Sequence, residues 1–496
     1  RSPFHCSPGV PSLDTALTPP IAPLSRLASM KVFSAVSAKS ASFGKKKASG
    51  SGSQPSSSTA YAKSAVYGSA AAPNTNDPDA DGYDPNGISG AGPSKFSNAG
   101  IPTNNKETKR MIKKEFMSIC PFIAVHSRIP VLYASFWTSF REIALASPYF
   151  DPPTRELMCV AVSKANHCTL CTQGHSFIAS AMGVGKEATL INSNQLSDLP
   201  SQEIIDLVKW SMNLADGRPA SLCEPGPLAT GAGVVFIKHY TNRVCSSMIP
   251  GTSLDPFSEL ALKKSGFGER IVKAILIGKV KIPKTPGESL ALLPLSAVSD
   301  IPDSAEGLPE KLKFAAGHEP IARALLRLME SINYLVDQFL SPDFKPAFFA
   351  AIADWDGTIQ GGCRVKKNAP PSEESGEWDQ IVDAKVKAAK LENAKYPLEP
   401  SLFRFCLQIA MSSHRITRAD LKRVRKECGS AVSDDDLLAV VCFASFWASA
   451  YVTSAVVARG AEEVGEAAAA AAAAVGAGGE GKAPVSEQSQ GKKTAA

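Results

Sequence analysis

Four residues at fixed offsets carry the chemistry that this chain offers. Cys168 and Cys171 stand three residues apart, His175 follows Cys171 by four residues, and Glu156 precedes Cys168 by twelve. Two thiols at such a short separation can close a disulfide when the chain turns between them. An imidazole and a carboxyl group beside them can move protons. The set therefore predicts thiol redox chemistry.

The spacing also predicts how these groups are arranged. If Cys168 opens a helix, its sulfur lies where unpaired backbone N–H groups and the helix dipole favour negative charge, which lowers the pKa of a thiol. Cys171 and His175 are then one turn apart on the same face. His175 can accept the Cys171 proton directly or through water, and Glu156, from the preceding helix, can orient or protonate His175.

The four positions resemble a known active site. Glu, Cys twelve residues later, Cys at fifteen and His at nineteen is similar to the pattern of the alkylhydroperoxidase D-like proteins, in the carboxymuconolactone decarboxylase superfamily. Ala161-Val162-Ser163 and Asn166 also look like that family. The run from His239 to Val244 is similar to a core-helix motif of its peroxidase-related branch. The resemblance covers residues 116–282 well, and residues 319–459 only as a degenerate copy.

The resemblance implies an antioxidant oxidoreductase that acts on hydroperoxides with a dithiol donor, and neither a cofactor nor a metal. Cys171 would attack the hydroperoxide O–O bond and become a sulfenic acid, and Cys168 would condense with it to a disulfide. A lipoyl- or thioredoxin-like dithiol would then reduce that disulfide. A homo-oligomer is also implied. The long leader, residues 220–233 and the second half depart from the family pattern, so the donor stays open.

Other interpretations compete with the redox one. A lyase or decarboxylase of the same superfamily would use His175 and Glu156 as acid and base on a lactone-like carbonyl, and would not need paired thiols. The cysteine pair can also be purely structural, in an inactive binding scaffold. A zinc site would take Cys168, Cys171 and His175 with His167 or Cys159, but structural zinc usually pairs two knuckles across a longer loop.

Hydrophobic periodicity predicts an all-α protein, because no convincing strand pattern occurs. In the first half, helices are expected at 154–165, at 168–182 with Asn166 as its N-cap and Gly183 at its end, at 201–215, at 231–248 and at 256–278. In the second half they are expected from 319 onward and at 345–353, 401–413, 417–428 and 434–459, with a surface loop at 364–377.

Composition divides the chain into segments. Residues 1–105 are rich in Ser, Ala, Gly, Pro and Lys, with Asp14 as the one acidic residue before Asn76, and are expected to be a disordered leader or a transit peptide. Residues 106–282 would form the alkylhydroperoxidase D-like redox domain and 283–318 a proline-containing linker. Residues 319–460 would form a degenerate second unit, with no Cys-x-x-Cys, and 461–496 a disordered Ala/Gly-rich tail.

Charge and cysteine usage limit the partners and the compartment. The net charge of +6 comes without a basic stripe, so no nucleic-acid partner is expected. The 11 cysteines are odd in number and scattered, unlike a secreted disulfide framework, and favour a reducing intracellular compartment. That compartment is a mitochondrion or plastid if the leader is a transit peptide, and otherwise the cytoplasm. The apolar run 437–458 contains several Ser and Thr residues and is expected to be a buried core helix rather than a membrane span.

Overall fold

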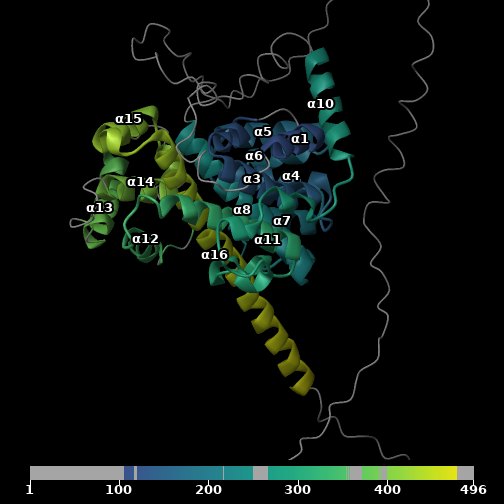
Figure 1. Cartoon of the computed structure of the whole chain (residues 1–496). Coiled ribbons are helices and arrows are strands. Elements are labelled where there is room, and N and C mark those ends of the chain that lie inside the picture. The colour runs from purple at the N-terminus through teal and green to yellow at the C-terminus, as the bar shows by residue number, and fades with distance from the viewer. Residues whose placement is uncertain are drawn as a thin grey trace, which may run out of the picture. The chain divides into compact units, whose positions relative to one another are not determined.

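The described residues form helices, turns and loops but no strand, so the predicted all-α class is confirmed (Figure 1). The computed structural model describes residues 105–477 except for 117–119, 216, 250–265, 354, 356, 358–370, 390 and 392–398. The predicted leader therefore lies almost wholly outside the described residues.

Short and long helices alternate in the first half. They are α1 (Asn105–Glu115), α2 (Pro121–Ala124), η4 (Val125–Arg128), α3 (Pro130–Phe140), η5 (Arg141–Ala146), α4 (Pro152–Ala165), α5 (Thr169–Ala181), α6 (Gly185–Asn192), η6 (Leu196–Asp198), α7 (Gln202–Ser211), η7 (Ala220–Leu222), α8 (Pro225–Met248) and α10 (Gly266–Val280).

The second half begins with four short 3-10 segments and continues with longer helices. They are η8 (Glu288–Leu292), η9 (Leu295–Ala297), η10 (Ala305–Gly307), η11 (Glu310–Ala315), α11 (Glu319–Val336), α12 (Phe344–Ile352), α13 (Pro371–Ala388), α14 (Glu399–Ser412), η13 (Ser413–Arg415), α15 (Arg418–Cys428), η14 (Gly429–Ala431) and α16 (Asp434–Ala477).

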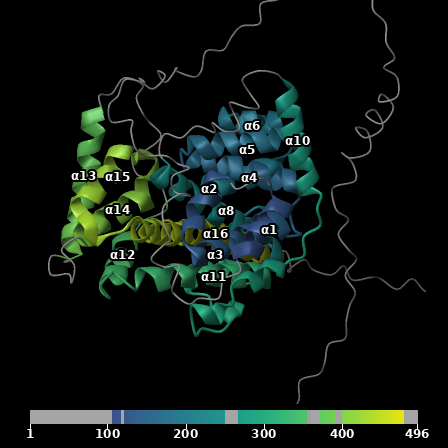
Figure 2. The ribbon, with the colours of Figure 1, turned by 45° about the horizontal axis from the view of Figure 1, so that its top comes forward.

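Helix α8 is the element around which the others pack. It contacts α4, α5 and η5 of the first half, and also α11, α16, η11 and η13 of the second half (Figure 2). Nearly its whole length is buried, including the polar side chains of Lys238, Asn242 and Arg243. Since a buried polar group needs a partner inside the protein, these side chains must be paired there.

Helix α4 lies between two clusters of buried apolar side chains. Met158, Cys159 and Val162 belong to the large core that extends through the second half. Leu157, Val160 and Ala161 pack in a smaller core with α5, α6 and α7. With both faces covered, α4 is a rigid support for the side chains that it carries.

A buried ion cluster fixes the end of α3, where the helix widens into the π-helical segment η5. The Arg141 guanidinium donates to Glu115 at 2.7 Å and to Glu142 at 2.7 Å, and all three side chains are buried. Glu142 also accepts hydrogen bonds from Gly287 and Ser289. The segment after α10 is thereby tied to the first half.

The core crosses the boundary between the two predicted units. Helix α11 packs on α3, and α16 packs on α8. The large core cluster contains buried apolar residues of both halves, and all described residues belong to one compact unit. A shared core is compatible with a duplicated chain, so the division into 106–282 and 319–460 stays a prediction.

Most predicted helices are present, with shifted ends. Pro152 lies inside the first turn of α4 with Asp151 as N-cap, and Ser201 caps α7. Two expectations were wrong in extent. Residues from Pro371 belong to α13 rather than to a surface loop, since proline suits a first turn. Helix α16 continues past Gly460 to Ala477, because its alanines have the highest helix propensity.

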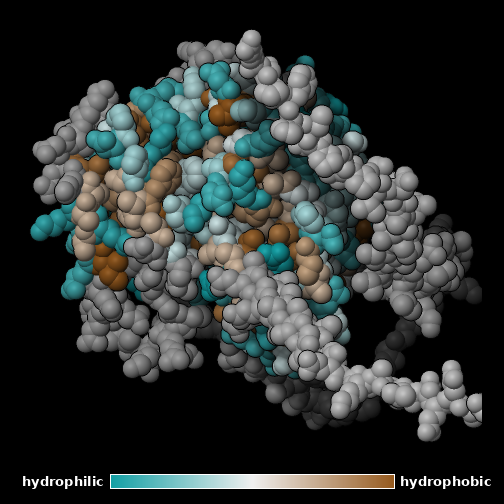
Figure 3. Space-filling model, turned by 90° about the horizontal axis from the view of Figure 1, so that it is seen from below, coloured by the Kyte–Doolittle hydropathy of each residue, from teal (hydrophilic) through white to brown (hydrophobic). Residues whose placement is uncertain are grey.

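Helix α16 has the length and apolar composition of a membrane span between Asp434 and Arg459. It is nevertheless largely buried inside the protein, against α8, α11, α14 and η11. This packing is that of a core helix, as the sequence predicted. On the face seen in Figure 3, hydrophobic residues are interspersed with hydrophilic ones. Among the described residues the large exposed hydrophobics are Tyr149, Leu214, Ile275 and Ile277.

Buried histidines predict that acid destabilises the fold. Burial lowers the pKa of His126 from its ordinary 6.5 to about 3 and that of His414 to about 4. Below pH 6.5 the unfolded chain therefore binds protons that the folded chain does not, so stability falls as the pH is lowered. For His126 the loss at pH 4 is roughly 3 kcal/mol. The midpoint temperature of thermal unfolding, measured by calorimetry, is expected to decrease as the pH is lowered from 7 to 4.

The His126→Gln variant is the control for this effect. His126 donates through Nδ1 to the Phe122 carbonyl and accepts from the Tyr240 hydroxyl through Nε2, each at 2.8 Å. Glutamine keeps a donor and an acceptor but does not titrate, so the variant is expected to lose less stability over the same pH interval. An identical pH dependence in both proteins would contradict this account.

Candidate active site

The turn between α4 and α5 determines where the first cysteine lies. The N–H of Cys168 donates to the Ser163 carbonyl and that of His167 to the Lys164 carbonyl, each at 3.1 Å. These bonds form a Schellman motif, which ends a helix with one residue in the left-handed region. His167 is that residue, with φ of 52°, at a cost of roughly 1–2 kcal/mol relative to glycine.

Cys168 is the N-cap of α5. Its sulfur accepts the backbone N–H of Cys171 at 3.4 Å, and its side chain is only 3% exposed. The expectation that Asn166 would cap this helix was wrong, because Asn166 is the C-cap of α4 and α5 starts three residues later. The predicted end of α5 at Gly183 is confirmed, since Gly183 follows the C-cap Met182 with φ of 89°.

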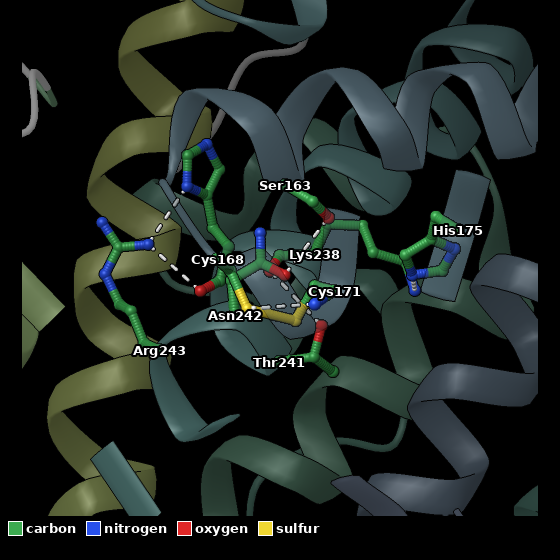
Figure 4. Close-up of a disulfide and its surroundings, with 9 residues drawn as sticks. Ser163, Cys168, Cys171, His175, Lys238, Thr241, Asn242 and Arg243 are labelled. Atoms are coloured by element: carbon green, nitrogen blue, oxygen red, sulfur yellow. Dashed lines mark hydrogen bonds between the residues drawn. A yellow bond between two sulfur atoms is a disulfide. The ribbon is translucent and has the colours of Figure 1, made fainter. Parts of the chain in front are cut away.

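Cys168 and Cys171 are joined by a disulfide, with their Cα atoms 5.3 Å apart (Figure 4). Cys171 is partly exposed, whereas Cys168 is buried. A molecule that approaches the pair therefore reaches the Cys171 sulfur first. If the disulfide opens, the Cys168 sulfur remains beside the N–H groups that favour its thiolate.

The predicted proton-transfer pair is also assembled. Nδ1 of His175 lies 2.7 Å from Oε2 of Glu156, and both side chains are mostly buried between α4 and α5. All four residues predicted from the sequence thus lie on two adjacent helices, α4 and α5.

The structure adds a residue that the sequence reasoning missed. Nζ of Lys238, on α8, lies 3.0 Å from Nε2 of His175. Lys238 directly precedes His239, at which the family-like motif was taken to begin. The available signal was a lysine inside an otherwise apolar helical run, where a charge is rarely buried without a partner.

Burial and neighbouring charges shift the pKa values of Glu156 and His175. Burial opposes ionisation of Glu156, but His175 and Lys238 outweigh it and hold the Glu156 pKa below its usual range. Burial and the adjacent Lys238 lower the pKa of His175, against the effect of Glu156. At neutral pH these shifts favour an ionised carboxylate and a neutral imidazole.

A thiol, that of Cys159, lies beside Glu156 and His175. Ligand atoms of Glu156, Cys159 and His175 all lie within 4.8 Å of one another, a set that could hold a metal ion. Both ring nitrogens of His175 already have partners, however, and burial raises the pKa of Cys159 to about 12, although Lys238 opposes this. A metal would have to displace the Lys238 ammonium and deprotonate a buried thiol, so the cluster suits proton transfer better.

Further polar side chains of α8 lie near the disulfide (Figure 4). Ser163 donates to Oδ1 of Asn242 at 3.4 Å. The buried Arg243 donates to Nδ1 of His239 and to the Ala410 carbonyl of α14. His239 thus packs inside the protein as a hydrogen-bond partner of Arg243. These contacts anchor α8 between the site and the second half of the chain.

Comparison with known proteins supports the assignment of this region. Residues 132–190 match the family model described as the carboxymuconolactone decarboxylase family. No curated protein and no solved structure matches the chain significantly. The matched segment contains Glu156, Cys168, Cys171 and His175 but ends before Lys238.

Selective alkylation tests the described geometry. After brief reduction, iodoacetamide is expected to label Cys171 first and Cys168 more slowly, because only Cys171 is partly exposed. Cys159, Cys245 and Cys442 are expected to stay unlabelled, since burial raises the pKa of each thiol to about 12.

Mass mapping of peptides with and without reduction gives the readout for this labelling. The exposed Cys223, which lies outside the pair, is the internal standard for accessibility. Labelling of Cys159 as fast as Cys171 would contradict the structure, as would a missing Cys168–Cys171 link in the unreduced sample.

Proposed function

Since the chain belongs to the carboxymuconolactone decarboxylase superfamily, which includes the alkylhydroperoxidase D-like proteins, we propose that it is a thiol-dependent peroxidase and disulfide reductase. The observation that carries this proposal is the Cys168–Cys171 disulfide at the N-terminus of α5, on the helix that also carries the hydrogen-bonded His175. A lyase that acts only through acid and base has no use for such a pair.

The oxidative half-reaction starts at Cys171, the more accessible sulfur. Its thiolate attacks one oxygen of the hydroperoxide, the O–O bond breaks, and the departing alkoxide or hydroxide takes up a proton. Cys171 becomes a sulfenic acid, and the Cys168 thiolate then attacks its sulfur. The S–S bond forms, and the sulfenic oxygen, on taking up a proton, leaves as water.

The reductive half-reaction has a preferred direction. A donor thiolate reaches the exposed Cys171 sulfur, forms a mixed disulfide there and expels Cys168 as a thiolate. Cys168 is the better leaving group, because the N-terminal N–H groups of α5 stabilise its negative charge, as the bond from Cys171 N–H shows. A second donor thiol then releases Cys171.

We further propose a dithiol electron donor and a reducing cellular compartment. A lipoyl- or thioredoxin-like dithiol fits a disulfide in which one sulfur, that of Cys171, is partly exposed. Several described free cysteines are buried as unreacted thiols, which fits a reducing intracellular compartment. We also propose a homo-oligomer, on the basis of the family resemblance.

Cysteine variants test the function. Cys171→Ser is expected to lower peroxide consumption by about 10³-fold or more, because the nucleophile is lost. Cys168→Ser is expected to accumulate a sulfenic acid or a mixed disulfide at Cys171, visible by mass spectrometry. Glu156→Gln is expected to lower the rate by about 10²-fold, the usual contribution of one acid–base group.

Cys223→Ser, which removes an exposed thiol outside the site, is the matched control and is expected to keep the parental rate. Peroxide consumption at the parental rate in both cysteine variants of the pair would refute the peroxidase. Turnover of a lactone-like substrate by the Cys168→Ser/Cys171→Ser double variant would favour the lyase.

A further inference from the structure

Lys238 lies in surroundings that a lysine rarely occupies. Its residue is 2% exposed, and its Nζ lies 5.1 Å from the centre of the Phe140 ring. The hydrogen-bond partner of this Nζ is Nε2 of His175, at 3.0 Å. Burial of an ammonium costs several kcal/mol unless it is compensated, so a position of this kind needs an explanation.

We propose that Lys238 is a positioning residue of the site, which fixes His175 as the neutral tautomer protonated at Nδ1 and stores the proton that the site donates. The first part stands on the geometry alone. The second part rests on the proposed redox function and assigns the direction in which the proton moves.

The tautomer follows from the hydrogen-bond inventory. An ammonium group can only donate, so Nε2 of His175 must accept from Lys238. The proton of the neutral ring is therefore on Nδ1, where it donates to Oε2 of Glu156 at 2.7 Å. An Nε2-protonated ring would instead direct two donors at each other across 3.0 Å.

The charges around the ring favour the same state. The groups that act on His175 are Glu156 of α4 and Lys238 of α8, with Cys159 of α4 in the same cluster and Cys171 on its own helix α5. Lys238 and burial act together to keep the imidazole neutral, against Glu156. In this state Glu156 is negative, His175 is neutral and Lys238 is positive. Lys238 donates a hydrogen bond to His175, and His175 donates one to Glu156.

This state makes the oxidised site a proton donor. His175 has no free lone pair, so it cannot accept a thiol proton while Lys238 donates to it. The step that follows the disulfide state is reduction, in which two S–S bonds break in turn and two thiolates leave. The second thiolate, Cys171, takes up a proton from the Lys238 ammonium, and Lys238 becomes a neutral amine. Protonation of that amine from solvent resets the site.

Nitrogen NMR of protein labelled with ¹⁵N-histidine tests the proposal directly. In the oxidised wild type at neutral pH, the His175 signal, assigned by its loss in His175→Gln, is expected to show a protonated Nδ1 and an unprotonated Nε2. A signal from the Nε2-protonated tautomer or from an imidazolium would overturn the proposal, with no variant of Lys238 needed.

Two variants of Lys238 extend the test. Lys238→Met fits the apolar surroundings and removes the charge. The titration of His175 is expected to move to higher pH, because burial and Glu156 still act on the ring but Lys238 no longer opposes its protonation. Lys238→Arg keeps a cationic donor and is expected to preserve the wild-type tautomer. An unchanged His175 titration in Lys238→Met would refute the role of the ammonium.

Lys164→Met is the matched control. Lys164 donates to the Asn192 carbonyl and lowers the pKa of His167, not that of His175. This variant is expected to move the His167 titration and leave the His175 signal in place. A shift of His175 in Lys164→Met as large as in Lys238→Met would assign the effect to general disturbance of the fold.

The reductive role has its own readout. Lys238→Met is expected to slow reduction of the disulfide by dithiothreitol more at high pH than at low pH, where solvent supplies the proton. Equal slowing at every pH would overturn the proton-storing role and leave the tautomer assignment intact. If the wild type consumes no peroxide, the proposed function fails, while the NMR result still decides the state of His175.

Discussion

The site depends on one imidazole held between a carboxylate and an ammonium. His175 contacts Glu156 at 2.7 Å through Nδ1 and Lys238 at 3.0 Å through Nε2. Neither partner lies on the helix that carries His175: one comes from α4 and the other from α8. The three groups satisfy one another only if these helices keep their relative positions, so the chemistry constrains the packing of the first half.

The rest of the fold holds those helices in place. Helix α4 is fixed between two apolar clusters, and α8 is surrounded by elements from both halves of the chain. The second half has no Cys-x-x-Cys of its own, yet α16 and α14 pack against α8, and Arg243 of α8 donates to a carbonyl of α14. Its contribution to the site is indirect, because it holds the helix that carries Lys238.

The sequence predicted the candidate residues that lie close together along the chain and missed the one that is distant in sequence. Cys168, Cys171 and His175 lie on successive turns of one helix, and Glu156 lies on the helix before, so their spacing alone places them together. Lys238 is 63 residues beyond His175, and only tertiary packing brings it to the ring. The cap of α5 was assigned wrongly because Asn166 has a strong capping propensity, whereas the Schellman turn at His167 leaves that role to Cys168.

The helices themselves were predictable from the sequence, whereas some of their ends were not. The all-α class and most helices follow from periodicity, but the end of α16 does not. Glycine at 460 suggested a stop, and the alanine run beyond it favours continuation. The π-helical widening at Arg141 was not predictable either, because it accompanies an ion cluster with Glu115 and Glu288, residues that are distant in sequence.

An ammonium suits this site better than a metal ion would. Either cation would neutralise Glu156, but a metal bound to Cys159 and His175 would occupy the ring nitrogen that accepts from Lys238 and would deprotonate a buried thiol. An ammonium binds thiolates only weakly, and it carries protons that it can give up. A disulfide that opens must gain protons as well as electrons, so in the proposed mechanism a buried lysine supplies both the positive charge and the proton without holding the product.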